Sequence, residues 1–266
     1  VESGPEDQLN QAEYPQPALL TASIALLRLA QARGLPSPDA VAGHSLGEYS
    51  ALVAAGVLQF ADAVMLVQKR GQFMQTAVPI GEGGMAAVLG LDDEQVREVC
   101  IAASQGEVVQ AVNYNAPGQV VIAGNNAAIE RAIKGCKEAG AKRAMALSVS
   151  APFHSELMKP AAEELTGVLN EVNFAKPKII VVQNVDAAVH DDPEEIRENL
   201  IKQMYGAVLW TDTVLMMKQI GVTTLIECGP GKVLTGLTKR IDKSITGHNV
   251  DSVASIATVS EALIDG

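Results

Sequence analysis

The sequence predicts an α/β fold in which helices cover both faces of a parallel sheet and a small separate domain is inserted. Three observations predict it. Strands and helices alternate in the first and last parts of the chain, which is typical of a parallel sheet. Residues 78–84 are dense in glycine and proline, and the pattern changes after them. An apolar run also passes through Gly43-His44-Ser45-Leu46-Gly47 into a helix, which indicates a strand, a sharp turn and a helix.

The first part of the chain is expected to place two helices beside the elbow, the name used here for residues 40–55. Residues 18–32 are apolar on nearly all sides, which predicts a buried helix ending at Gly34. Residues 48–55 form the elbow helix, and residues 62–74 form the next one.

Residues 81–149 are expected to form the small domain, and residues 1–80 and 150–266 the large α/β core. The small domain reads as strand, helix, strand, strand, helix and strand over 85–89, 93–103, 108–112, 119–123, 126–139 and 143–149. This βαββαβ order can form a complete split βαβ sandwich.

The last part returns to alternating elements. Helices are predicted over 160–171, 193–204, 211–220 and 233–241, and strands over 178–182 and 223–227. In the tail, we expect a last strand over 253–256 and the end of a helix over 259–263.

Composition limits the functional classes. A net charge of −11 argues against a nucleic-acid partner, which would need a basic face. No apolar run reaches the length of a membrane span, so no membrane association is expected. The 3 cysteines match no metal-ligand spacing and favour a reducing, cytoplasmic location.

Ser45 is the candidate nucleophile. A sharp turn lifts its hydroxyl clear of the sheet, and we expect Gly43 and Gly47 to be needed because a Cβ at either would collide with the neighbouring backbone. The start of the next helix directs the N–H of Leu46 toward a developing oxyanion. The alternative is a purely structural turn.

A serine hydroxyl needs a base, and His154 is the preferred one of four histidines. It lies where the chain returns from the small domain, near the carboxyl edge of the sheet. A core histidine is the alternative. No acid of a triad is evident, so an oxygen of Gln203 or Asn184 is expected to orient the imidazole.

Arg70 is the informative cation. It lies in a mostly apolar helix, where its guanidinium could form a bidentate pair with a carboxylate. A surface ion pair is the alternative, and spacing alone does not separate the two.

Several motifs in one order resemble the bacterial malonyl-CoA:acyl-carrier-protein transacylase family over essentially the whole chain. They are Gly43-His44-Ser45-Leu46-Gly47-Glu48, Lys69-Arg70-Gly71, the segment 113–124, Phe153-His154, Lys159-Pro160-Ala161 and the segment 227–234. The resemblance implies a hydrolase-like parallel-sheet core with a ferredoxin-like insert. It also implies ping-pong transfer of malonyl from malonyl-CoA to the phosphopantetheine thiol of acyl carrier protein, for fatty acid synthesis and without a cofactor.

The resemblance assigns roles by motif. Ser45 matches the nucleophile, His154 the base, and Arg70 the arginine that binds the malonyl carboxylate. Gln203 matches the residue whose oxygen orients the histidine, and Leu46 supplies an oxyanion N–H. The remaining candidates for substrate binding are Gln16, Asn113 and Phe153. In related acyltransferase domains, a phenylalanine before the histidine accompanies a preference for malonyl over methylmalonyl. The alternative role of Phe153 is packing.

One departure affects the expected rate. Members of this family begin with a strand that ends in a Gly-Gln-Gly-Ser-Gln loop, whose first glutamine supplies a second oxyanion donor, and no segment here matches it. We therefore expect the chain to begin several dozen residues into the family pattern. Loss of one such donor typically slows acyl transfer about 100- to 1,000-fold, so this polypeptide is expected to be weak or inert.

Two other functions remain open at this stage. One is a serine esterase or thioesterase on the same elbow, against which Arg70 and the missing triad acid argue. The other is a non-catalytic module that docks acyl carrier protein.

Overall fold

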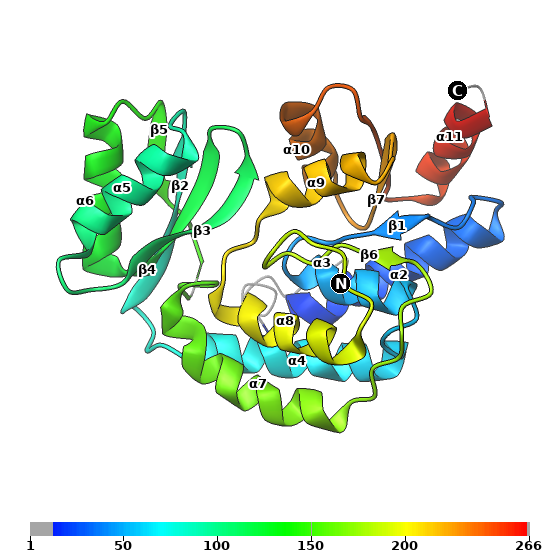
Figure 1. Ribbon diagram of the computed structural model, residues 1–266, viewed down its shortest axis with the longest axis horizontal. Helices are drawn as coiled ribbons and strands as arrows, with labels where there is room; N and C mark the ends of the chain where they lie inside the picture. The colour runs from blue at the N-terminus through cyan, green and yellow to red at the C-terminus, as the bar shows by residue number, and fades with distance from the viewer. Residues whose placement is uncertain (1–12, 150, 265–266) are drawn as a thin grey trace.

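The computed structural model describes residues 13–149 and 151–264, which form a mixed α/β structure (Figure 1). The first elements are α2 (Pro15–Ala32), β1 (Ala40–Val41), α3 (Leu46–Ala54) and α4 (Phe60–Thr76). Next come β2 (Gly83–Leu89), α5 (Asp93–Ser104), β3 (Val109–Ala116), β4 (Gln119–Asn125), α6 (Asn126–Glu138) and β5 (Arg143–Ala146).

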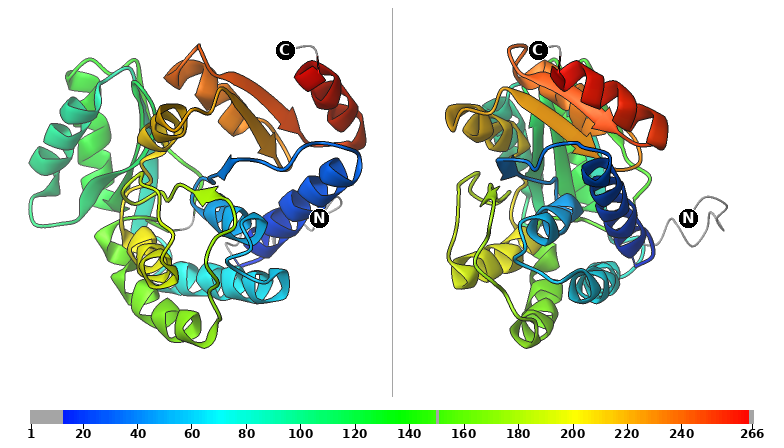
Figure 2. Two further views of the ribbon diagram at one scale, coloured as in Figure 1. Left: turned by 45° about the vertical axis from the view of Figure 1, so that its right-hand side comes forward. Right: turned by 90° about the vertical axis from the view of Figure 1, so that its right-hand side faces the viewer.

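The later elements alternate again. They are the short 3-10 helix η1 (Glu156–Met158), α7 (Lys159–Glu171), β6 (Ile180–Val181), α8 (Pro193–Tyr205), α9 (Trp210–Gln219), β7 (Thr224–Cys228), α10 (Val233–Ile241), β8 (Thr246–Val250) and α11 (Val253–Ile264). The four-stranded sheet with α5 and α6 lies at one end of the molecule and α11 at the other (Figures 1 and 2).

The four-stranded sheet is antiparallel, with the strand order β3-β4-β2-β5. Its two faces differ in role. Ala86 and Val88 of β2 face a cluster that includes residues of α5 and α6, whereas Met85 faces the opposite way and packs near Phe153. Because Phe153 precedes His154, this second face helps to place the candidate base.

The edge strand β3 is also tied to the segment that leads into α9. The N–H of Tyr114 donates to the carbonyl of Val208 at 3.0 Å, and the N–H of Val208 donates to the carbonyl of Val112 at 2.8 Å. These backbone bonds fix the sheet against the rest of the chain.

The expected single parallel sheet is wrong for the described strands. They form two separate parallel pairs, β1 with β6 and β7 with β8. Because the two pairs do not meet, an apolar groove of about 580 Å³ lies between β1 and β7, lined by residues that include Ile24, Val41 and Leu225.

Two predictions about helices also need correction. α2 is not buried on nearly all sides: Leu19 is 41% exposed, and its buried residues are Gln16, Leu20, Ile24 and Ala30. Residues 253–256 begin α11 instead of forming a strand. Ser252 accepts from the N–H of Ser255 at 3.2 Å, and Ile256 and Val259 are buried at helical spacing.

The main hydrophobic core lies among α2, α3, α4, α7 and α8, beneath the elbow (Figure 1). Among the residues that the structure describes, no helix combines the length and the apolar character needed to cross a bilayer.

Candidate active site

The elbow holds Ser45 in a strained backbone conformation. Its φ is 52° and its ψ is −106°, at the junction of β1 and α3. A Cβ on Gly43 would lie 2.0 Å from the carbonyl carbon of Gly47, so residue 43 must be glycine. A Cβ on Gly47 would meet nothing within 4 Å, so the expected requirement for glycine there is wrong. Gly47 already lies on the open side of the first turn of α3.

His154 contacts the serine directly. Its Nε2 lies 2.7 Å from the Oγ of Ser45, and its Nδ1 lies 2.7 Å from the backbone oxygen of Gln203. A carbonyl oxygen can only accept, so Nδ1 carries the proton and Nε2 can accept from the serine hydroxyl. Burial and the charge of Arg70 lower the pKa of His154 to about 3, which keeps the imidazole neutral and able to accept a proton.

Arg70 is a buried cation, 2% exposed, on α4. Its Nη1 donates to the Oε1 of Gln16 at 2.7 Å, and its Nη2 donates to the Oγ of Ser45 and the Oε1 of Gln203, each at 3.0 Å. These partners are all neutral. The ring of Tyr49 lies 5.4 Å from the guanidinium carbon.

The surface ion pair considered for Arg70 is wrong. Among the residues described, no carboxylate lies within ion-pair distance of its guanidinium. A buried charge without a counter-ion is costly, and an anionic ligand would offset that cost. The site therefore favours a substrate that carries a negative charge close to the serine.

Gln203 and Asn184 were both considered for orienting the imidazole of His154, and the structure gives them different contacts. The backbone oxygen of Gln203, not its amide, orients His154. The amide nitrogen of Gln203 donates to the backbone oxygen of Ser45 at 3.1 Å. Asn184 does not contact the imidazole: its Oδ1 accepts from the N–H of Ser45 at 2.7 Å.

The other predicted residues are spread around this centre. Leu46 is the first residue of α3, and none of the hydrogen bonds between described residues uses its N–H. Gln16 reaches the site through Arg70. Phe153 packs between the main core and the small sheet. Asn113 is buried in β3, and the described contacts do not connect its side chain with Ser45.

Two further histidines are held elsewhere. The Nε2 of His44 lies 2.8 Å from the Oδ1 of Asn115, and its ring packs against Trp210 with 5.7 Å between centroids. His190 lies at the surface, paired with Asp186 and Glu195.

Two residues that support the site, Glu48 and Gln183, were not predicted from the sequence. Glu48 is 1% exposed, and it accepts from the Gln183 side chain and from the N–H of Asn184. In the sequence, a glutamate in the first turn of a helix is typical of a solvated position. The signal that could have indicated Glu48 is its charge, because the rest of this helix is mostly apolar.

Taken together, the described contacts join the candidate nucleophile Ser45, the neutral imidazole of His154, the backbone carbonyl that orients it and the buried cation Arg70. The acyl transferase domain family matches residues 1–261 of this chain. The chain belongs to the acyl transferase domain family. The resemblance inferred from the motifs is thereby confirmed, and the relatives specify it further.

This acyl transferase domain is 52% identical over 261 residues to the malonyl CoA-acyl carrier protein transacylase of Escherichia coli (strain K12), covering 98% of this chain and 84% of the relative. It is 49% identical over 261 residues to the protein of the same name from Bacillus subtilis (strain 168), covering 98% and 82%.

Solved structures agree with this assignment. The crystal structure of the acyl-carrier-protein S-malonyltransferase from Burkholderia pseudomallei 1710b is similar to the acyl transferase domain with a TM-score of 0.96 and 54% identity, covering 98% of this chain and 85% of that one. A solved complex of a type II PKS acyl-carrier protein with its malonyl-transacylase is similar with a TM-score of 0.96 and 50% identity, covering 98% and 84%.

Proposed function

We propose that the protein is an acyl-carrier-protein S-malonyltransferase, which moves malonyl from malonyl-CoA to the phosphopantetheine thiol of acyl carrier protein for fatty acid synthesis. The observation that carries this proposal is the position of Arg70, a buried cation that has no carboxylate within ion-pair distance among the described residues and lies 3.0 Å from the Oγ of Ser45. Malonyl differs from acetyl by a free carboxylate, which is the group that such a cation would bind.

In the first half-reaction, Ser45 attacks the thioester carbonyl of malonyl-CoA. His154 accepts the hydroxyl proton on Nε2, while the backbone oxygen of Gln203 holds Nδ1–H. The carbonyl oxygen becomes an oxyanion, and the N–H of Leu46 at the start of α3 donates to it. The intermediate collapses, the C–S bond breaks, and coenzyme A leaves with the proton from His154.

In the second half-reaction, the phosphopantetheine thiol of acyl carrier protein attacks the malonyl-serine ester. His154 takes the thiol proton and returns it to the Oγ of Ser45 as the C–O bond breaks. Arg70 holds the malonyl carboxylate through both steps, which positions the acyl group for the incoming thiol. Transfer to the thiol is thereby favoured over hydrolysis.

No redox change occurs in either half-reaction, so the proposed chemistry needs no cofactor. Coenzyme A takes part only as the thioester substrate. We place the reaction in the cytoplasm, where the free thiols of Cys100, Cys136 and Cys228 would stay reduced.

We also propose the domain organisation expected from the sequence. Residues 1–80 and 150–266 form the large α/β core, whose described parallel strands are the two pairs β1–β6 and β7–β8, and residues 81–149 form a ferredoxin-like insert. The strand order β3-β4-β2-β5, with α5 and α6 packed against β2 and its neighbours, supports the assignment of the insert.

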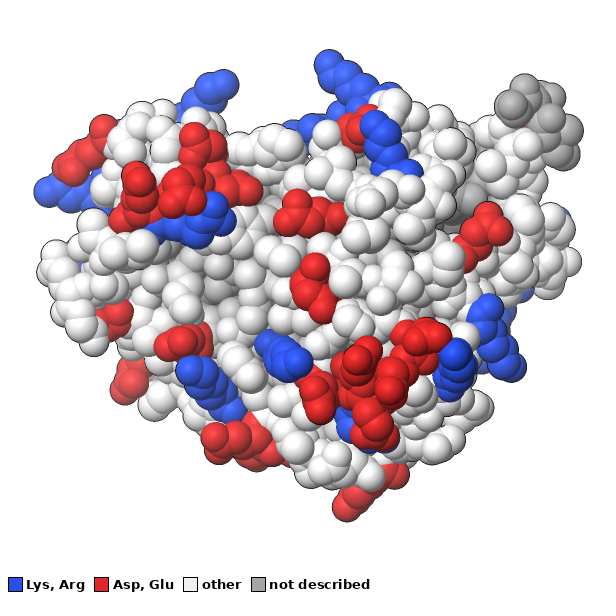
Figure 3. Space-filling model, viewed as in Figure 1, with Lys and Arg blue, Asp and Glu red and all other residues white. Residues whose placement is uncertain are grey.

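The surface charge is consistent with protein and small-molecule partners and not with nucleic acid. On the face drawn in Figure 3, lysines and arginines are scattered among aspartates and glutamates and do not merge into a continuous basic surface.

Mass spectrometry after exposure to malonyl-CoA tests the proposal. With prolonged exposure, because acylation is expected to be slow without the second oxyanion donor, the protein should gain one malonyl group on Ser45, and the adduct should persist until holo acyl carrier protein is added. Ser45→Ala should gain none. Hydrolysis of malonyl-CoA without acyl carrier protein and without an accumulating adduct would indicate a thioesterase. Binding of acyl carrier protein with neither an adduct nor hydrolysis would indicate a docking module. Either result overturns the proposed transferase.

A further inference from the structure

Asn184 holds the backbone of the nucleophile on two sides. Its Oδ1 accepts from the N–H of Ser45 at 2.7 Å, and its Nδ2 donates to the carbonyl of Gly43 at 2.8 Å. Ser45 has a positive φ, a conformation that costs a non-glycine residue about 1–3 kcal/mol and persists only when the surroundings enforce it. Asn184 is a principal part of those surroundings.

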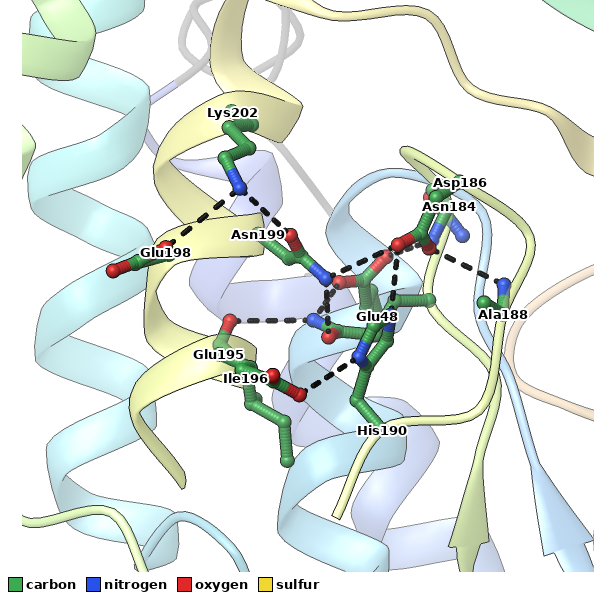
Figure 4. Close-up of polar contacts among 11 residues, drawn as sticks. Glu48, Asn184, Asp186, Ala188, His190, Glu195, Ile196, Glu198, Asn199 and Lys202 are labelled. Carbon is green, nitrogen blue, oxygen red and sulfur yellow. Dashed lines mark hydrogen bonds and ion pairs between the residues drawn. The ribbon is translucent and has the colours of Figure 1, made fainter. Parts of the chain in front are cut away.

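Asn184 is itself held by Glu48. The N–H of Asn184 donates to the Oε2 of Glu48 at 2.8 Å, and the Nε2 of Gln183 donates to the Oε1 at 3.0 Å. Glu48 lies in the first turn of α3, the helix that begins directly after Ser45. The carboxylate thus ties the loop after β6 to the elbow helix (Figure 4).

We infer that Glu48 is a positioning residue for the nucleophile: its ionised carboxylate fixes Asn184, and Asn184 in turn fixes the backbone of Ser45 so that the hydroxyl is aimed at His154. This role is additional to the roles of the base, the orienting carbonyl and the cation in the proposed function.

The charge state of Glu48 decides how well it performs this role. Both of its oxygens face N–H donors, so the ionised form, which is acceptor-only on both oxygens, is the one that matches Gln183 and Asn184 together. In a protonated Glu48, the hydroxyl hydrogen would face one of these two N–H groups, so the hydrogen bond to that group would be lost. Burial raises the pKa of Glu48 to about 7, which brings this change into the neutral range.

The polar network continues to the surface. The Oε1 of Gln183 accepts from Asn199 at 3.1 Å, and the same Asn199 nitrogen lies 3.5 Å from Asp186. Asp186 pairs with His190 at 2.7 Å (Figure 4). The titratable or charged groups around Glu48 and this network are Tyr49 of α3, Arg70 of α4, His44 and His154 at the nucleophile, Glu195, Glu198 and Lys202 of α8, and Asp186 and His190 of the loop.

The inference is tested by the rate at which Ser45 reacts as a function of pH between about 5.5 and 9. Two reagents are used: malonyl-CoA, whose use rests on the proposed function, and a fluorophosphonate probe, which reports an activated serine whatever the substrate. In the wild type, we expect both rates to fall about tenfold on the acid side of a midpoint near pH 7, because one bond to a charged group is lost. His154 does not cause this change, because its pKa is lowered to about 3.

Glu48→Gln is expected to react about tenfold more slowly at pH 8.5 and to lack the transition near pH 7, because an amide can accept only one of the two bonds at any pH. The matched control is Glu195→Gln, which changes a carboxylate on α8 with a side chain that is 62% exposed. A second control, His190→Asn, removes the histidine at the surface end of the network. Both controls should keep the wild-type rate and transition.

Asn184→Ala provides a second test that leaves Glu48 in place. It should slow the reaction and abolish the transition, because the carboxylate can no longer act through the Asn184 amide. The inference is overturned if folded Glu48→Gln or Asn184→Ala retains the wild-type rate and the transition. If the probe shows the expected profiles while malonyl-CoA fails to acylate Ser45, the proposed function fails and the positioning role stands.

Discussion

The Nη2 of Arg70 lies 3.0 Å from the Oγ of Ser45, and the Nε2 of His154 lies 2.7 Å from the same oxygen. The cation and the base therefore share one hydroxyl. The positive charge of Arg70 disfavours a second positive charge on the imidazole, so a carboxylate bound to Arg70 would make His154 a stronger base. In the proposed reaction, this contact would couple binding of the substrate carboxylate to activation of Ser45.

Arg70→Met should abolish the preference for malonyl. We expect the specificity constant for malonyl-CoA to fall by at least about 100-fold, because a carboxylate would then be buried without its partner, while acetyl-CoA loses little. Steady-state kinetics with both thioesters measure the effect. Arg28→Met, which changes an exposed arginine beside Phe60 on another helix, is the control. A malonyl preference that survives in Arg70→Met would remove the carboxylate role.

The same variant should raise the pKa of His154 above its wild-type value of about 3, because the charge of Arg70 contributes to lowering it. Burial is the larger cause, so the pKa should remain below that of an exposed histidine. Titration of the imidazole by NMR in wild type and Arg70→Met measures the shift. An unchanged pKa would mean that the two groups are electrostatically independent.

Gly43→Ala and Gly47→Ala form a matched pair within one turn. A Cβ on Gly43 would lie 2.0 Å from backbone atoms of Gly47, so this variant should lose several kcal/mol of stability, about 3 or more, or fail to fold. Gly47 lies within α3 with open space at its Cβ position, and its replacement should be neutral or stabilise by up to about 1 kcal/mol. Urea unfolding of both variants measures the two changes in the free energy of unfolding. Equal destabilisation by both substitutions would contradict the difference in space at the two Cβ positions.

Gln203→Ala should affect substrate binding more than the base. The backbone oxygen that orients His154 remains, whereas the side-chain oxygen that accepts from Arg70 is lost. We expect the Michaelis constant for malonyl-CoA to rise about tenfold and the turnover rate to change less. If the turnover rate instead fell by about 100-fold or more, as loss of a general base produces, this division of roles would be contradicted.

Ionisation of Glu48 should lower the stability of the wild type, although it raises the reaction rate, and Glu48→Gln should remove this pH dependence of stability. Burial raises the pKa of Glu48 from 4.5 to about 7 on folding, so the folded state binds the proton more tightly than the unfolded state. Ionisation between these pH values therefore costs the wild type stability, by up to about 3 kcal/mol above pH 7. The free energy of unfolding of wild type relative to Glu48→Gln should fall between about pH 5 and pH 8 in urea titrations. A constant difference would contradict the raised pKa.

Much of the architecture could be read from the pattern of residues. The order of helices and strands in the small domain matches β2 to β5 with α5 and α6 because each element has a clear period and clear ends. The strand predicted over 253–256 was wrong because two of its four residues, Val253 and Ile256, are β-branched and favour a strand locally, whereas burial of Ile256 and Val259 on one helical face decides the conformation. The parallel strands were expected in one sheet because strand pairing between distant segments leaves no local pattern.

The amino-acid sequence predicted the residue types of the site: a serine in a sharp turn, a histidine and an arginine from their local motifs, and a glutamine from the family resemblance. Which atoms of these residues touch depends on the folded chain. In the folded chain, the backbone oxygen of Gln203 orients His154, the side chain of Asn184 contacts the backbone of Ser45, and Glu48 contacts the backbone N–H of Asn184. The physical reason is that these contacts join segments as far as 139 residues apart, and their geometry depends on the packing of whole helices and loops.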